Sequence, residues 1–241
     1  ELQGAYALGV VSTREPGRLV AARLGSPLVV GVGIGEHFIA SDVAAMLPVT
    51  QRFIFLEDGD VADLYQDHLQ IYDRLGQAVE RQVHELNMRA DAAEKGSFRH
   101  YMLKEIFEQP RAVADTLSGR ISGERVLEES FGPKAADIFD KVKAVQIIAC
   151  GTSYHAGLIA RHWLETIAAT PCQVEVASEF RYRKPIIGDQ TLIVTISQSG
   201  ETADTLAALQ ETKRRGYGPS LTICNVPESY LVRESDVKLM T

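Results

Sequence analysis

The chain has 241 residues, of which 45% are hydrophobic, so it is long enough to bury a substantial core in one or two domains. It carries 25 lysine and arginine residues against 32 aspartate and glutamate residues, and the formal net charge of −7 excludes a general electrostatic attraction to nucleic acid. No apolar run approaches the roughly 18 residues needed to cross a bilayer, and three scattered cysteines form neither a disulfide framework nor a zinc pattern.

The first part of the sequence, to about residue 85, alternates short apolar runs with turns rich in Gly, Pro and Asp. This pattern is typical of an antiparallel sheet. A short helix is predicted after Ser41 and Asp42, because a capping residue and an acid precede an apolar segment that Pro48 ends. The predicted strands are residues 5–11, 28–32, 38–40, 52–56, 61–65 and 68–72.

The composition changes near residue 90. Polar and small residues between about Asn87 and Gly96 predict an interdomain linker. Residues 98–116 have apolar positions at helical spacing that are interrupted at Pro110, which predicts two helices or one kinked helix packed on the sheet that follows. A loop with a short helix is predicted for residues 122–132, and a helix for residues 135–141.

The last part of the sequence alternates apolar runs rich in β-branched residues with helical patterns. Strands are predicted at residues 145–149, 191–196, 220–224 and 237–240. Helices are predicted after the first two strands, where apolar side chains recur at helical spacing. This alternation predicts an α/β fold, with a parallel sheet flanked by helices and right-handed crossovers.

Two hydroxyl-rich turns follow predicted strands of this sheet. Residues 150–153 read Cys-Gly-Thr-Ser, and residues 197–202 read Ser-Gln-Ser-Gly-Glu-Thr. Free N–H groups and the positive end of the helix dipole meet at such turns, and hydroxyl and amide groups add donors for an anion. Both turns can face one pocket if their strands are neighbours. The candidate binding residues are Thr152, Ser153, Ser197, Gln198, Ser199 and Thr202.

The alternative is that these hydroxyls are ordinary helix N-caps, which need no ligand. For one turn alone we favour that alternative. Two such turns, each with a glycine (Gly151 and Gly200) that permits close approach of the backbone, favour binding.

Other polar residues near the turns have simpler interpretations. We interpret Arg181, Arg183 and Lys184 as a solvated helix end. Glu201 is interpreted as an acid in the first turn of the helix that follows, where the helix dipole favours it. Cys150 is interpreted as a small buried residue at a strand end, and not as a thiol nucleophile.

The sequence resembles the glutamine–fructose-6-phosphate aminotransferase family. The two turns, extended to residues 150–154 and 197–205, are similar to the sugar-phosphate motifs of that family's first sugar isomerase (SIS) domain. Essentially the whole chain is covered, so the resemblance is to this family specifically and not merely to SIS domains in general. Further similar segments are residues 25–28, 39–42, 55–60, 100–110, 177–183, 224–227 and 231–236.

The resemblance implies a division of the chain. Residues 1–88 would be the C-terminal part of a glutamine amidotransferase type 2 domain with the mainly β N-terminal-nucleophile fold. Residues 89–98 would be a linker, and residues 99–241 an isomerase region with an incomplete first SIS domain from about residue 135. With no initiator Met and a first segment that already resembles a strand, the chain is expected to be an internal fragment.

The resemblance also implies a function. Residues 197–202 would hold the phosphate of fructose 6-phosphate or glucosamine 6-phosphate, with Thr152 and Ser153 nearer the sugar. The family's catalytic residues have no counterpart here, so the fragment is expected to lack catalytic residues and to be inactive alone. Glutamine would bind only to the intact enzyme, a cytoplasmic homodimer of amino-sugar biosynthesis that needs no cofactor or metal. The alternative is a non-catalytic SIS-type sugar-phosphate sensor, which the strand-rich first part disfavours.

Overall fold

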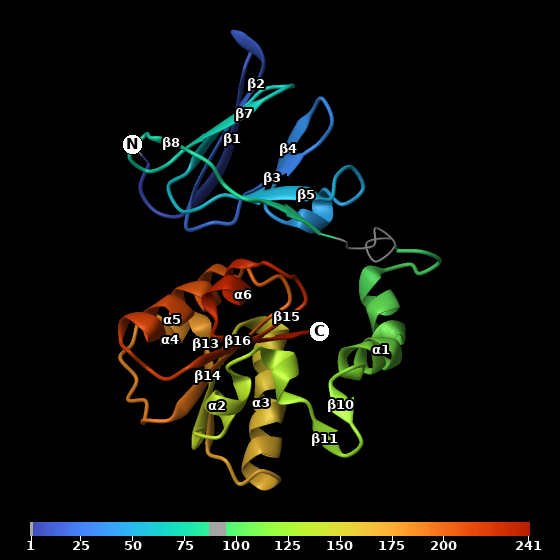
Figure 1. The fold of residues 1–241 in the computed structure, drawn as a ribbon, viewed down its shortest axis with the longest axis vertical. Helices are drawn as coiled ribbons and strands as arrows, with labels where there is room; N and C mark the ends of the chain where they lie inside the picture. The colour runs from blue at the N-terminus through green and yellow to red at the C-terminus, as the bar shows by residue number, and fades with distance from the viewer. Residues whose placement is uncertain (1, 87–94) are drawn as a thin grey trace. The chain divides into compact units, whose positions relative to one another are not determined.

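The computed structural model describes residues 2–86 and 95–241, which form two compact units (Figure 1). One unit extends to Arg99, and the other runs from His100 to Thr241. The predicted linker at residues 89–98 lies partly outside the described residues, which resume at Lys95. None of the helices in the described part of the chain is long and apolar enough to cross a membrane.

The first unit contains two antiparallel sheets, which confirms the predicted mainly β character. One sheet has the order β1-β2-β6-β7-β8, from β1 (Tyr6–Ser12), β2 (Glu15–Leu24), β6 (Val61–Leu64), β7 (Leu69–Tyr72) and β8 (Ala78–Val79). The other has the order β4-β3-β5-β9, from β4 (His37–Ala40), β3 (Val29–Val32), β5 (Arg52–Phe55) and β9 (Val83–Glu85). The predicted short helix is a 3-10 helix, η1 (Val43–Ala45).

The core of this unit joins the two sheets. Ala21 and Leu64 from the first sheet pack in one buried cluster with Val30 and Ile54 from the second. Three strands of the unit, β2, β8 and β9, were not predicted. Strand β2 begins with Glu-Pro-Gly-Arg, in which Pro and Gly are rare in strands, and it pairs with β1 across a hairpin.

The second unit begins with α1 (Tyr101–Leu117), a single helix that contains Pro110. The prediction that this segment packs on the sheet is wrong, because no residue of α1 is buried. Helical spacing of apolar residues shows which side chains share a face, but not what covers that face. After α1 come a small hairpin and two short helices, namely β10 (Ile121–Ser122), β11 (Arg125–Val126), the 3-10 helix η3 (Glu128–Phe131) and α2 (Ala135–Phe139).

The main sheet of the second unit is parallel throughout, as the sequence predicted, with the order β13-β12-β14-β15-β16. Its strands are β12 (Ala144–Ala149), β13 (Cys172–Val176), β14 (Thr191–Ser197), β15 (Ser220–Cys224) and β16 (Val237–Met240). The connecting helices are α3 (Gly151–Thr166), α4 (Ala177–Phe180), α5 (Ala203–Arg214) and α6 (Tyr230–Glu234). The edge strand β13 was not predicted.

Helices cover both faces of this sheet, which confirms the predicted α/β class. Val145 and Val194 pack on one face in a cluster that includes residues of α2 and α3. Ile148 and Ile193 pack on the other face with residues of α4 and α5. Successive side chains along β12 and β14 point to opposite faces of the sheet, so apolar side chains are buried under the helices on both faces. The ends of the strands remain available for other contacts.

A buried ion pair stabilises the first unit and generates a stability prediction. Asp60 is 2% exposed and accepts two hydrogen bonds of 2.9 Å from Arg81 and one of 2.8 Å from the Glu57 N–H. Replacing Asp60 with Ala removes the acceptor of all three hydrogen bonds and leaves Arg81 with its ion pair to the exposed Glu57 carboxylate at 3.1 Å. We therefore expect unfolding of this unit to become easier by about 2–3 kcal/mol. Hydrogen exchange of the β6 amides would measure the change.

Asp67→Ala is the matched control, because it removes the same charge from an exposed pair with His68. Exposed ion pairs contribute at most about 1 kcal/mol. Equal protection of the β6 amides in the two variants would contradict the importance of the Asp60 pair.

Candidate functional site

The two predicted turns lie side by side at the carboxyl ends of two neighbouring strands of the parallel sheet. Strands β12 and β14 are hydrogen-bonded neighbours, and Ala149 pairs with Ile196 at their carboxyl ends. The next residue of each strand, Cys150 and Ser197, therefore begins one of the two turns. Loops at the carboxyl ends of neighbouring parallel strands are where open α/β sheets bind ligands.

The first turn leads directly into α3. Cys150 is the N-cap of this helix with extended backbone, and its side chain makes no capping hydrogen bond. Gly151 follows with φ +57°, a left-handed conformation that glycine adopts without strain. Thr152 is exposed and Ser153 is half-buried in the first turn of the 16-residue helix. Their hydroxyls thus lie beside the free N–H groups of a helix N-terminus.

The second turn is closed by its own hydroxyl groups. Ser197 is 4% exposed, and its Oγ accepts the Gly200 N–H at 3.1 Å and lies 2.9 Å from Thr202 Oγ1. Ser199 Oγ accepts the Glu201 N–H at 3.2 Å. Gln198 is exposed, whereas Ser199 and Thr202 are half-buried. Ser197 therefore shapes the turn, and the other candidates present groups at its surface.

Ordinary capping does not account for these hydroxyls. Thr202 is the N-cap of α5, yet its side chain makes no capping hydrogen bond and pairs instead with Ser197. Thr152 and Ser153 lie inside α3 and not at its N-cap. The arrangement leaves both helix N-termini without a side-chain cap, which is suited to an external anion.

Residues beyond β15 support the second turn, and the sequence did not reveal this role. The N–H of Asn225 donates to the Gln198 carbonyl at 3.3 Å, and the N–H of Leu231 donates to the Gly200 carbonyl at 3.1 Å. Both donors lie in segments that the resemblance highlighted, 224–227 and 231–236. Nothing in their residue types indicated a contact with the turn, because the donors are backbone groups.

The interpretation of Glu201 needs correction. Helix α5 begins at Ala203 with Thr202 as its N-cap, so Glu201 precedes the helix and is not in its first turn. Its Oε1 accepts the N–H of Tyr230, the first residue of α6, at 2.8 Å. The acid therefore interacts with a different helix from the one that the sequence suggested.

The basic residues after α4 are engaged in ion pairs, in line with their interpretation as a helix end. Arg181 is the C-cap of α4 and donates to Asp204 at 2.7 Å. Arg183 donates to Glu175 at 2.7 Å, and this carboxylate raises the pKa of the guanidinium. Lys184 is exposed. Positive charge from the two arginines is thus largely balanced by neighbouring carboxylates.

The cysteines show no arrangement for nucleophilic chemistry. Cys150 is half-buried, and in the described part of the chain no hydrogen bond joins it to His155, whose ring packs against Tyr154 at 5.5 Å. Burial raises the pKa of Cys172 to about 11 and also raises that of Cys224. A thiol with a raised pKa stays protonated near neutral pH, where it is a poor nucleophile.

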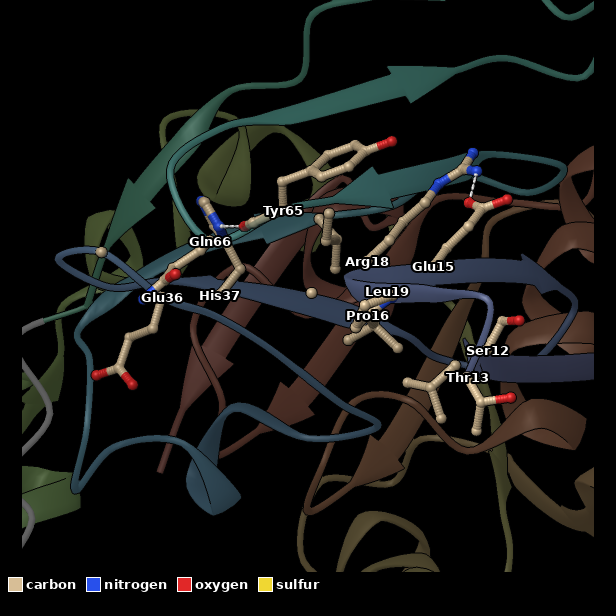
Figure 2. Close-up of a pocket in the computed structure, with 14 residues that line it drawn as sticks. Ser12, Thr13, Glu15, Pro16, Arg18, Leu19, Glu36, His37, Tyr65 and Gln66 are labelled. Atoms are coloured by element: carbon tan, nitrogen blue, oxygen red, sulfur yellow. Dashed lines mark hydrogen bonds and ion pairs between the residues drawn. The ribbon is translucent and has the colours of Figure 1, made fainter.

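The first unit holds a separate cavity of about 590 Å³ beside the β1–β2 hairpin. Figure 2 shows Arg18, Glu15, His37 and Tyr65 around it. The Arg18 guanidinium donates to both oxygens of Asp63 and also pairs with Glu15, which raises its pKa. Two carboxylates already neutralise this arginine, so the cavity is poorly suited to a phosphate group.

Comparison with known proteins defines the class of the second unit. Residues 138–241 match the family model of the SIS domain. A solved structure, the C-terminal domain of glucosamine-fructose-6-phosphate aminotransferase from Francisella tularensis, is 51% identical with a TM-score of 0.59. The match covers 61% of this chain and 42% of that one. The second unit therefore contains an SIS domain, which covers residues 138–241.

The relationship extends across both units. Glutamine–fructose-6-phosphate aminotransferases from Pseudomonas putida and Idiomarina loihiensis are 58% and 59% identical over the full length of this chain. The chain spans 39% and 40% of these two relatives. The whole chain is thus homologous to part of the glutamine–fructose-6-phosphate aminotransferases.

Substitution of two glycines, Gly200 and Gly216, tests the tight packing behind the second turn. Gly200 has φ +68°, and a Cβ there would lie 2.0 Å from Ser229 Oγ. Replacing Gly200 with Ala adds a steric clash to backbone strain, so we expect it to lower the free energy of unfolding of this unit by about 3 kcal/mol. Denaturant unfolding followed by Trp163 fluorescence would measure the loss.

Gly216→Ala is the matched control. Gly216 has the same φ of +68°, but no atom lies within 4 Å of the added Cβ. Backbone strain alone should cost about 1 kcal/mol. Similar losses in both variants would show that the contact with Ser229 is unimportant.

Proposed function

We propose that the two turns after β12 and β14 together bind the phosphate and sugar of fructose 6-phosphate or glucosamine 6-phosphate. The single observation that carries this proposal is the pairing of β12 with β14, which sets two uncapped helix N-termini side by side. The proposed binding residues are Thr152, Ser153, Ser197, Gln198, Ser199 and Thr202.

The chemistry of the turns fits a phosphate dianion. Serine and threonine hydroxyls donate to phosphate oxygens, and the Gln198 amide offers two further N–H donors. The N-termini of α3 and α5, with 16 and 12 residues, add backbone donors and partial positive charge. Neutral groups can therefore hold the dianion although the nearby Arg181 and Arg183 are engaged elsewhere.

The second unit would position the acceptor in a glutamine-dependent aminotransferase that makes glucosamine 6-phosphate. Binding and orientation lower the barrier without bond chemistry by these residues. The names of the relatives support this activity, and the two antiparallel sheets fit part of a glutaminase domain and favour the enzyme over a sugar-phosphate sensor. The intact protein would act in the cytoplasm as a homodimer in amino-sugar biosynthesis, and it would bind glutamine through residues outside this chain.

The binding proposal is tested by replacing both Ser199 and Thr202 with Ala in the full-length aminotransferase. Loss of these hydroxyl contacts to a charged phosphate should cost about 2–5 kcal/mol, so the KM for fructose 6-phosphate should rise by at least about thirtyfold. Steady-state kinetics with varied fructose 6-phosphate would measure it. An unchanged KM would remove these residues from the site.

Thr166→Ala is the control, because this exposed hydroxyl lies at the opposite end of α3 and donates to a backbone carbonyl. Its KM should remain at the parent value.

The 241-residue chain alone is expected to be inactive. We expect it to bind fructose 6-phosphate weakly or not at all, and to form neither glucosamine 6-phosphate nor glutamate from glutamine. Calorimetric titration and product assays would check this, with the full-length enzyme as the positive control. Formation of glucosamine 6-phosphate by the purified chain would contradict the expectation.

A further inference from the structure

The second turn is attached to the segment that follows β15 through three of its residues, Gln198, Gly200 and Glu201. The carbonyl of Gln198 accepts the Asn225 N–H at 3.3 Å, and the carbonyl of Gly200 accepts the Leu231 N–H at 3.1 Å. Between these two carbonyls, the Gly200 Cα lies against the Ser229 side chain so closely that a Cβ would not fit. The course of the turn therefore depends on residues 224–231.

The third attachment is made by a side chain. Glu201 Oε1 accepts the Tyr230 N–H at 2.8 Å. Tyr230 is the first residue of α6, so its N–H has no acceptor within the helix. A carboxylate at this position makes a charge-assisted hydrogen bond and also interacts favourably with the helix dipole.

The position of Glu201 in the turn gives this contact a consequence for binding. Glu201 lies between Gly200 and Thr202, and its own N–H donates to Ser199 Oγ at 3.2 Å. Two proposed phosphate-binding residues are thus linked to Glu201, Ser199 by this hydrogen bond and Thr202 by the peptide bond. The Glu201 carboxylate is in turn held by the first N–H of α6. Misplacement of catalytic or binding groups by about 1 Å can cost a hundredfold in rate.

We propose that Glu201 is a positioning residue that fixes the sugar-phosphate turn by binding the first N–H of α6. The inference rests on the proposed function, because it assigns the turn its ligand. Glu201 acts through the backbone of the turn, and its carboxylate makes no contact with the substrate. An acidic side chain is poorly suited to contact a phosphate, and this one would support binding through its hydrogen bond to the Tyr230 N–H.

The test compares variants of the full-length aminotransferase by KM for fructose 6-phosphate, kcat and thermal midpoint. Glu201→Ala should raise KM about tenfold, whereas Glu201→Gln, which keeps an acceptor oxygen, should stay within about threefold of the parent. Added to the Ser199/Thr202 double alanine variant, Glu201→Ala should raise KM by a smaller factor than it does in the parent, because two of the hydroxyls that it positions are gone.

A second pair of variants removes the donor. Tyr230→Pro deletes the N–H at the first helical position, where proline is well tolerated, and Ser229 already has the extended backbone that proline requires. Tyr230→Ala keeps the N–H and loses only the ring. KM should rise about tenfold in the proline variant relative to the alanine variant, and this result stands even if Glu201→Ala fails to fold.

The outcomes separate the two proposals. If the Ser199/Thr202 variant raises KM but Glu201→Ala and Tyr230→Pro do not, the positioning role is wrong and the binding site stands. If the Ser199/Thr202 variant leaves KM unchanged, the proposed function itself fails. A lower thermal midpoint with an unchanged KM in the Glu201 variants would show a purely structural role and overturn the inference.

Glu211→Ala is the control. Glu211 is another acid, in the last part of α5, and it pairs with Arg214 and Arg215. Its replacement should leave KM unchanged.

Discussion

The parallel pairing of β12 with β14 is the constraint on which the candidate site depends. Each strand alone would present one helix N-terminus with a few hydroxyls, an arrangement common in proteins that bind nothing there. Pairing in register, with Ala149 opposite Ile196, places two such N-termini at adjacent positions. The apolar side chains of both strands are buried under helices on each face, so the register cannot slip without exposing them.

Much of this arrangement could be predicted from the sequence because its signals are local. The β-branched runs that end at Ala149 and Ile196 predicted the two strands, and the glycine–hydroxyl turns after them predicted their ends. The alternation of strand and helix then predicted a parallel sheet, although it did not predict strand order. Candidate residues such as Gln198 and Thr152 followed from the same local signals.

The parts that could not be predicted depend on contacts distant in sequence. Strand β13 alternates Gln173 and Glu175 with apolar residues, so it lacks the continuous apolar run of a central strand and is recognisable only by its pairing with β12. The support of the second turn by residues 224–231 uses backbone N–H groups, which every residue except proline has. Glu201 illustrates the limit, because its position suggested one helix and its carboxylate contacts another.

The two hydrogen bonds that Ser197 Oγ makes, with the Gly200 N–H and with Thr202 Oγ1, have a consequence for the kinetics of ligand exchange. Because Ser197 Oγ orders the turn through contacts within the protein, the loss of backbone entropy is incurred during folding and not during association. In the proposed binding role, such a preorganised turn would accept a phosphate ester without loop closure of its own. The rate of capture would then be set by diffusion and by how fast the rest of the enzyme opens, and not by rearrangement of the cradle.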